Sequence, residues 1–278
     1  MTDSPFEFEA TVLTPSTCCL RVARNLEGEV HLPAEIDGRR VVVVDPIYSS
    51  FKGNASIIVP EGVVAIGHET FIDAFKLDAI TLPDSLRSIG VNPFLNNGIR
   101  EIRINPEHPV FSFRDGFLIN KQTGTLISAL ENHCGEVIRL PEGLSVIGNR
   151  ALDSFDDPHD VIIPEGVHTI NELAFNQFFQ LGQVTFPSTL RVIRRYAFQG
   201  CWVCDPKDLI LPEGLEILRG NVFLSCEKLR SVTLPASLRE IGEYAFCGCA
   251  EDFTLRVHRG TFGEQYALSE GYRTVYAD

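Results

Sequence analysis

The chain has 278 residues, 44% of them hydrophobic and 22% charged, and its mean hydropathy of +0.06 is that of an ordinary soluble protein. Its net charge of −13 argues against a nucleic-acid partner, because contacts to phosphates need a basic surface. No apolar run approaches the roughly 18 residues of a membrane helix. Residues 1–9 also lack the basic and apolar regions of a signal peptide, so the chain as written is expected to be cytoplasmic.

Residues 1–28 are predicted to form an N-terminal cap. Apolar and polar residues alternate over 6–12, a turn sequence follows at 14–17, and a second apolar stretch occupies 18–23. Alternation of this kind is typical of a half-buried strand. We therefore expect an antiparallel hairpin that covers the apolar end and open strand edge of the repeats that follow.

A repeating unit begins in the early coils, residues 29–105, and continues through the regular coils, residues 135–250. Each copy has a marker proline, with apolar residues three and six positions later and a large apolar residue eleven positions later. Most successive copies lie 23 residues apart, as Pro141 and Pro164 do. The marker prolines are Pro60, Pro83, Pro141, Pro164, Pro187, Pro212 and Pro235. A fixed period of about 20–29 residues indicates a solenoid of the leucine-rich-repeat kind.

Each copy is predicted to be one coil of an α/β solenoid. The strand before the proline should direct alternate residues into the core, and the proline should end it. A second short extended piece carries the apolar residues at the third and sixth positions, and a short helical turn then brings the large residue inward. Because each coil packs on its neighbours, we expect a single domain spanning residues 1–278.

Two segments depart from the repeat. Residues 106–134 read as three inserted strands, 110–113, 117–120 and 125–130, with hairpin signals at Asp115-Gly116 and Thr123-Gly124. This insertion either flanks one edge of the solenoid or widens a binding surface. Residues 251–278 read as a C-terminal cap, with strands at 253–257 and 272–276 on either side of a helix at 261–270.

The repeat resembles a known family. The stretch 232–249, V-T-L-P-A-S-L-R-E-I-G-E-Y-A-F-C-G-C, is similar to the BspA-like leucine-rich repeats, and the stretch 186–201 follows the same pattern. The resemblance covers nearly the whole chain. It implies the solenoid fold and a role in binding or adhesion at a surface. Because relatives are often exported, it also implies an extracellular or cell-surface alternative to the cytoplasm.

Cysteines form the most chemically suggestive pattern. Cys201 and Cys204 make a C-x-x-C pair, which can signal a redox pair or half of a zinc site. However, Cys201, Cys226 and Cys249 all lie fourteen residues after a marker proline, and Phe178 fills the same position in another copy. A position that accepts phenylalanine is a packing position. We therefore expect a buried cysteine ladder, with no metal and no cofactor.

No sequence pattern nominates a catalytic group. The chain lacks the short motifs of zinc proteases, serine hydrolases, phosphate-binding loops and EF-hands. Its seven histidines are scattered, and two of them, His68 and His168, fall at surface-facing repeat positions. We expect no enzyme.

The outward face of the main sheet is the candidate binding surface. Residues two before the marker prolines should point away from the core, and they are small, β-branched and mostly neutral. The candidates are Thr81, Arg139, Ile162, Thr185, Ile210 and Thr233. The composition also fits plain β-propensity on an exposed sheet. Arg139 is the long charged residue of this row, and it follows the insertion closely, so we expect the insertion to stand beside it.

These patterns favour a non-enzymatic scaffold that binds a partner protein. The flat outward row supports a protein partner, and the lack of an aromatic row makes a glycan the less favoured one. The alternative is a structural or self-associating repeat protein with no dedicated ligand.

Overall fold

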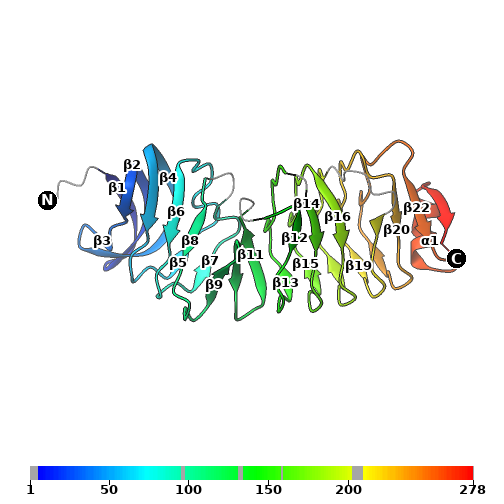
Figure 1. Cartoon of the computed structure of the whole chain (residues 1–278), viewed down its shortest axis with the longest axis horizontal. Helices are drawn as coiled ribbons and strands as arrows, with labels where there is room; N and C mark the ends of the chain where they lie inside the picture. Colours follow the sequence, from blue (N-terminus) through cyan, green and yellow to red (C-terminus); the bar gives the residue numbers. More distant parts are fainter. Residues whose placement is uncertain (1–5, 95–97, 131–133, 158, 202–208, 278) are drawn as a thin grey trace. The chain divides into compact units, whose positions relative to one another are not determined.

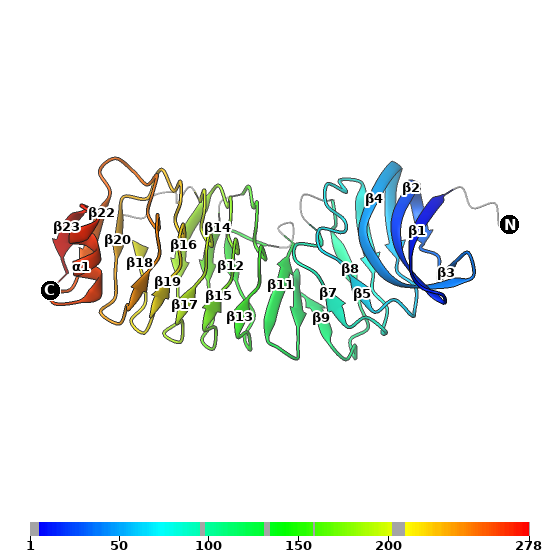
Figure 2. The same ribbon diagram turned by 180° about the vertical axis from the view of Figure 1, so that it is seen from behind.

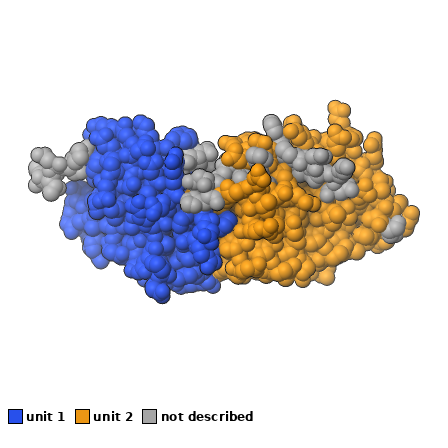
Figure 3. Space-filling view, in the orientation of Figure 1, with its two compact units in different colours: residues 1–122 blue, residues 123–278 orange. Residues whose placement is uncertain are grey.

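The computed structural model describes residues 6–94, 98–130, 134–157, 159–201 and 209–277. The chain divides into two compact units, residues 1–122 and 123–278, which Figure 3 shows in separate colours. Within the described ranges, α1 (Phe262–Ser269) is the single helix, and strands joined by turns make up the coils (Figure 1). The predicted solenoid of strand-rich coils is therefore confirmed.

The described residues of the first unit contain β1 (Glu7–Thr14), β2 (Thr17–His31), β3 (Glu35–Ile36), β4 (Arg39–Ile58), β5 (Ala65–Ile66), β6 (Leu77–Thr81), β7 (Ser88–Ile89), β8 (Glu101–Arg103), β9 (Phe111–Arg114) and β10 (Phe117–Asn120). The predicted N-terminal hairpin is confirmed, because β1 and β2 pair antiparallel with Val12 opposite Cys18.

Two strands of the first unit are longer than the sequence suggests. β2 runs beyond the predicted hairpin to His31, and β4 continues around a corner of its coil. The early part of β4 places Val43 beside Ala65 of β5, and its late part places Ile57 beside Ile80 of β6. Pro46 lies within β4 without ending it, and the marker proline Pro60 comes only after Ile58.

The structure contains the first hairpin predicted for the inserted segment. The third predicted strand, over 125–130, instead takes part in the repeat. β9 and β10 pair antiparallel around Asp115 and Gly116, whose φ angles of 52° and 84° are left-handed. β11 (Thr125–Ala129) belongs to the second unit and pairs in parallel with β13 (Val146–Ile147). Thr125 and Leu126 therefore hold the second-strand position of a coil rather than an insertion.

The second unit stacks its remaining strands in two sets, which Figures 1 and 2 show from opposite sides. The main-sheet set is β12 (Val137–Arg139), β14 (His159–Ile162), β16 (Leu181–Thr185), β18 (Leu209–Ile210), β20 (Ser231–Thr233), β22 (Thr254–Val257) and β23 (Arg273–Tyr276). The second set continues after β11 and β13 with β15 (Thr169–Ile170), β17 (Val192–Ile193), β19 (Ile217–Leu218) and β21 (Glu240–Ile241). In the described residues the main-sheet set forms two sheets, β12–β14–β16 and β18–β20–β22–β23, and the paired strands of both sets run parallel.

The third side of each coil consists of consecutive turns, and the predicted helical turn is wrong. Residues nine and thirteen after the marker proline take left-handed φ angles, such as 58° at Leu173 and 52° at Gln177. The amides of Leu173, Phe175 and Gln177 donate to carbonyls of the next coil, at 3.2, 2.8 and 2.8 Å. A helix would instead direct every such amide back along its own segment. Bonds between coils therefore replace bonds within a helical turn.

Stacked phenylalanines fill the core behind these turns. Phe175, Phe198, Phe223 and Phe246 stack in sequence with ring centroids 4.8, 5.4 and 5.7 Å apart. All four are buried, as are most of the Ile and Leu residues six positions after the marker prolines, namely Ile66, Ile147, Ile170, Ile193 and Leu218. The predicted hydrophobic ladder is confirmed.

A glutamate clamp joins coils at the marker prolines. The Glu165 carboxylate accepts from the Ser188 amide at 2.9 Å and from its hydroxyl at 3.0 Å. In return, the Gly166 amide donates to Thr189 Oγ1, whose hydroxyl donates to a carbonyl of the earlier coil. Hydrogen bonding to the Ser188 amide lowers the pKa of Glu165. Related bonds recur in two other places. The Glu61 carboxylate accepts from the Ser85 amide, and the Gly62 amide donates to Ser85 Oγ. The Glu213 carboxylate accepts from the Ala236 amide, and the Gly214 amide donates to Ser237 Oγ.

The strand, helix and strand expected of the C-terminal residues are present. β22, α1 and β23 follow in the expected order, and β23 pairs in parallel with β22. Thr261 caps the helix by accepting from the Glu264 amide. Tyr266 and Tyr272 pack against Phe246, so the cap covers the end of the phenylalanine stack.

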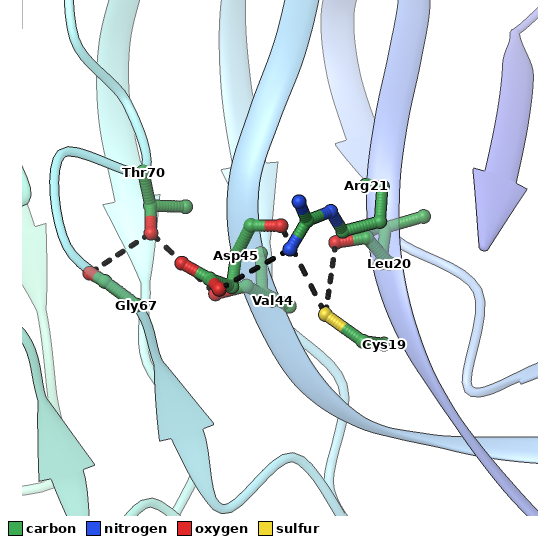
Figure 4. A network of polar contacts seen from close by, with 7 residues as sticks. All are labelled: Cys19, Leu20, Arg21, Val44, Asp45, Gly67 and Thr70. Atoms are coloured by element: carbon green, nitrogen blue, oxygen red, sulfur yellow. Dashed lines mark hydrogen bonds and ion pairs between the residues drawn. The ribbon is translucent and has the colours of Figure 1, made fainter. Parts of the chain in front are cut away.

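A polar network fixes the start of the first unit (Figure 4). Arg21 Nη1 lies 3.3 Å from Asp45 Oδ2, and the Cys19 thiol lies 3.8 Å from the Asp45 carbonyl. A Cβ atom added at Gly67 would lie 1.7 Å from Asp45 Oδ1. Asp45 therefore occupies the space that a side chain at position 67 would need.

Candidate binding surface

The predicted outward residues form rows across the main sheet. Parallel pairing sets Arg139 of β12 beside Ile162 of β14, and Ile162 beside Thr185 of β16. Further along the second unit, Ile210 of β18 stands beside Thr233 of β20. In-register stacking thus turns residues far apart in the sequence into neighbours about 4.8 Å apart.

Strand alternation explains why these side chains face outward. Ile138 and Leu140 are buried on either side of Arg139, which is exposed. Thr185 and Ile210 are exposed as well, and 65% of Ile210 is open to solvent. Ile162 and Thr233 are half-buried.

The sixth predicted residue, Thr81, belongs to the first unit. It lies on β6 between Ile58 of β4 and Arg103 of β8, and it is half-buried. Its row is therefore separate from those of β12–β16 and β18–β23.

The structure adds arginines that the proline frame misses. Arg103 occupies the row position on β8, and Arg256 occupies it on β22 beside Thr233. Asn105 and His258 stand where a marker proline would be, so the prolines gave no signal. Arg139 is thus one of several row arginines. Outward positions can also be counted from the apolar residues of each strand, such as Ile102 and Leu255. That count would have found Arg103 and Arg256.

Arg139 differs from Arg103 in its surroundings. Arg103 Nη2 contacts Glu101 Oε2 at 2.7 Å. The guanidinium of Arg139 has no hydrogen-bond or ion-pair partner in the part of the chain that the structure describes. The β9–β10 hairpin belongs to the first unit and Arg139 to the second, so a shared corner between them remains a prediction.

The cysteine positions follow the packing prediction. Cys201 and Cys226 are fully buried, and their thiols donate to the carbonyls of Phe175 and Phe198 at 2.8 and 3.0 Å. Burial raises the pKa of both thiols, and it raises that of Cys249 to about 12. The buried ladder position is confirmed for Cys201 and Cys226, whereas Cys249 is half-buried, with its thiol 3.6 Å from the Phe223 carbonyl. Cys204 lies outside the described residues.

Histidines occupy two kinds of environment. His68 and His168 are exposed, as predicted. His108 is buried, and its Nδ1 accepts from the amides of Val110 and Phe111 at 3.2 and 2.9 Å. Its Nε2 lies 3.2 Å from the Pro83 carbonyl. The Nδ1 atom is therefore unprotonated, and His108 pins the turn before β9 to the coil that Pro83 begins.

Two further features bear on function. Across the described ranges, no three His, Cys, Asp or Glu side chains are grouped so that they could hold a metal ion. In those ranges α1 is too short to cross a membrane, and no other helix is present to do so.

The repeat itself identifies the family. The BspA type leucine-rich-repeat pattern, in six copies, matches residues 47–118, 128–204 and 202–259. The chain belongs to the BspA-type leucine-rich-repeat family. No curated protein sequence matches this BspA-type chain.

Solved structures share the fold of this BspA-type protein. The pneumococcal vaccine antigen PcpA is 13% identical, with a TM-score of 0.57 over all of this chain and 98% of that one. A leucine-rich cell surface protein from Faecalibacterium prausnitzii is 18% identical, with a TM-score of 0.59 over 96% of each chain. A leucine-rich-repeat protein from Eubacterium ventriosum is 16% identical, with a TM-score of 0.50 over 89% of this chain and 92% of that one.

Proposed function

We propose that this protein is a non-enzymatic scaffold that binds a partner protein through the outward rows of its main sheet. The observation that carries the proposal is the row Arg139–Ile162–Thr185, together with exposed apolar residues on the same set of strands. Val137, Ile210 and Val275 are 41%, 65% and 40% exposed. A rigid sheet with apolar area and an unpaired arginine has the composition of a protein interface, in which arginine is enriched.

We also infer that the protein acts at the cell surface. The F. prausnitzii structure is described as that of a cell surface protein, and PcpA as a vaccine antigen. Brief protease treatment of intact host cells tests the compartment. If the protein lies on the cell surface, the protease should release fragments of its solenoid into the medium. If the protein is cytoplasmic, it should stay intact until the cells are lysed.

A pull-down from host lysate and medium tests the binding surface. A variant carrying Arg139→Glu and Ile210→Glu should lose the proteins that the wild type retains. The matched control carries Arg87→Glu and Leu268→Glu, which alter one exposed arginine just before β7 and one exposed leucine of α1. If the row variant retains the same proteins as the control, the rows are not the binding surface.

A further inference from the structure

A break in the repeat pattern occurs on the second strand set, away from the outward rows. Seven residues after the marker proline, glycine stands at Gly67, Gly90, Gly148 and Gly242. A Cβ atom added at Gly90, Gly148 or Gly242 would lie 2.3–2.5 Å from the backbone of a neighbouring coil. Three consecutive coils nevertheless carry long polar residues there: Asn171, Arg194 and Arg219.

The backbone does not require these arginines. The Gly148 amide donates to Leu126 of the preceding coil at 2.9 Å. The Arg194 and Arg219 amides make the equivalent bonds to Ile170 and Ile193, also at 2.9 Å. The hydrogen bond between coils therefore forms with either glycine or arginine at this position. Departures from a local rule without structural gain are expected at functional sites.

Four arginines lie on the coils where arginine replaces the repeat glycine. We term them the arginine surface: Arg191, Arg194, Arg195 and Arg219. All four are exposed. The guanidinium groups of Arg194 and Arg195 have no hydrogen-bond or ion-pair partner within the described ranges. Arg191 Nη1 caps the carbonyls of Ser188 and Leu190 at 2.9 and 3.0 Å, and Arg219 pairs with Glu240.

Pairing between coils places these residues together. The Arg191 amide donates to His168 of the preceding coil, and the Glu216 amide of the next coil donates to Arg191. The β17–β19 register sets Ile193 beside Leu218. Arg194 and Arg219 are the next residues after these two adjacent strands. The result is a group of four arginines on adjacent coils of a chain whose net charge is −13.

We propose that the arginine surface docks a short, carboxylate-rich segment of a partner protein. Arginine forks bind carboxylates in a bidentate manner, and unpaired guanidinium groups leave their donors available. Exposed or half-exposed acidic residues border the surface at Glu172, Glu216 and Glu243. They limit it to a short segment, because a long polyanion such as nucleic acid would run across these carboxylates and be repelled.

The test is binding of a fluorescently labelled oligoglutamate peptide to the full chain, measured by anisotropy at low salt. An oligoglutamine peptide is the neutral control. The Arg194→Glu/Arg195→Glu variant should raise the Kd about tenfold or more, because it replaces two attractive contacts with two repulsive ones. Circular dichroism verifies folding. An Arg194→Gln/Arg195→Gln variant removes the charges without reversal and keeps the test open if the first variant does not fold.

An Arg114→Glu/Arg230→Glu variant provides the control, because it changes the net charge equally at two other exposed arginines. It should bind like the wild type. Equal weakening in the control, or no binding by the wild type, overturns the proposal. Tighter binding of a heparin oligosaccharide than of oligoglutamate overturns the assignment to carboxylate. These outcomes are independent of the outward rows, so the proposed function stands or falls separately.

Discussion

Single residues in this protein are set by their neighbours in the adjacent coil as much as by the repeat. Gly67 holds a glycine position of the repeat, but its own reason is local, because Asp45 fills the space where its Cβ would stand. Asp45 in turn lies 3.3 Å from Arg21 (Figure 4). The repeat predicts a small residue at position 67, whereas the identity of the obstructing group could only come from the structure.

Gly67→Ala should destabilise the protein by about 1–3 kcal/mol, as overpacking does. Gly53→Ala is the control, since a Cβ there would meet Glu27 at an ordinary 3.5 Å. This control should change stability by less than about 1 kcal/mol, towards greater stability. Urea midpoints compare the two variants. Equal losses would show that the clash with Asp45 is not the cause.

His108 should make stability depend on pH. Burial lowers its pKa, and the nearby Asp84 opposes the shift while Arg87 and Lys121 assist it. Above the unfolded pKa of about 6.5, both states are neutral and the contribution of the two bonds to Nδ1 is complete. As pH falls below that value, the unfolded chain gains a proton first, so stability is lost.

The measurement is urea unfolding of the wild type and His108→Gln at about pH 7.5 and about pH 5.5. The wild type should be the more stable at the higher pH, and its advantage should shrink at the lower one. Other titrating groups cancel in the difference between the two proteins. An advantage that stays constant with pH would contradict the role of the neutral imidazole.

At the scale of elements, the sequence predicts what repeats and little of what does not. The apolar positions of the repeat locate the strands of the regular coils and the phenylalanine stack. The turns were mistaken for helix because their amides bond to the next coil, which local sequence does not report. Arg103 and Arg256 were missed because Asn105 and His258 replace the proline that marks the row. The glutamate clamp depends on residues 23 apart, beyond any local pattern.

The phenylalanine stack should dominate stability. Phe198 lies between Phe175 and Phe223 in the core, so Phe198→Ala should cost about 3–5 kcal/mol. Thr185 is exposed, and Thr185→Ala should change stability by less than about 0.5 kcal/mol. Equal shifts of the urea midpoint for the two variants would contradict the inward and outward assignment.

The cysteine ladder should protect its thiols. Cys201 and Cys226 are buried with raised pKa values, so a maleimide should label them only after unfolding, whereas the exposed Cys247 should react in the native protein. Mass spectrometry after limited labelling locates the modified sites. Elemental analysis of unsupplemented protein should find less than one zinc per chain. Native labelling of Cys201 or stoichiometric zinc would contradict the packing role.

For the whole molecule, charge decides between the binding scaffold and its self-associating alternative. The strand edges that the sheet order leaves in the described residues include β1 and β23, the first and last strands, and open edges invite pairing with another copy. Charged residues guard both, with Glu7 and Glu9 on β1 and Arg273 on β23. A net charge of −13 adds repulsion between copies at every orientation.

We therefore expect the protein to stay monomeric. Light scattering over a concentration series should give one constant mass at low salt. It should give the same mass in about 0.5 M NaCl, where screening reduces the repulsion to distances of a few ångströms. A mass that is constant at low salt but grows at high salt would show that repulsion alone keeps open edges apart. Growth with concentration under both conditions would favour the self-associating alternative, because specific contacts would then outweigh the charge.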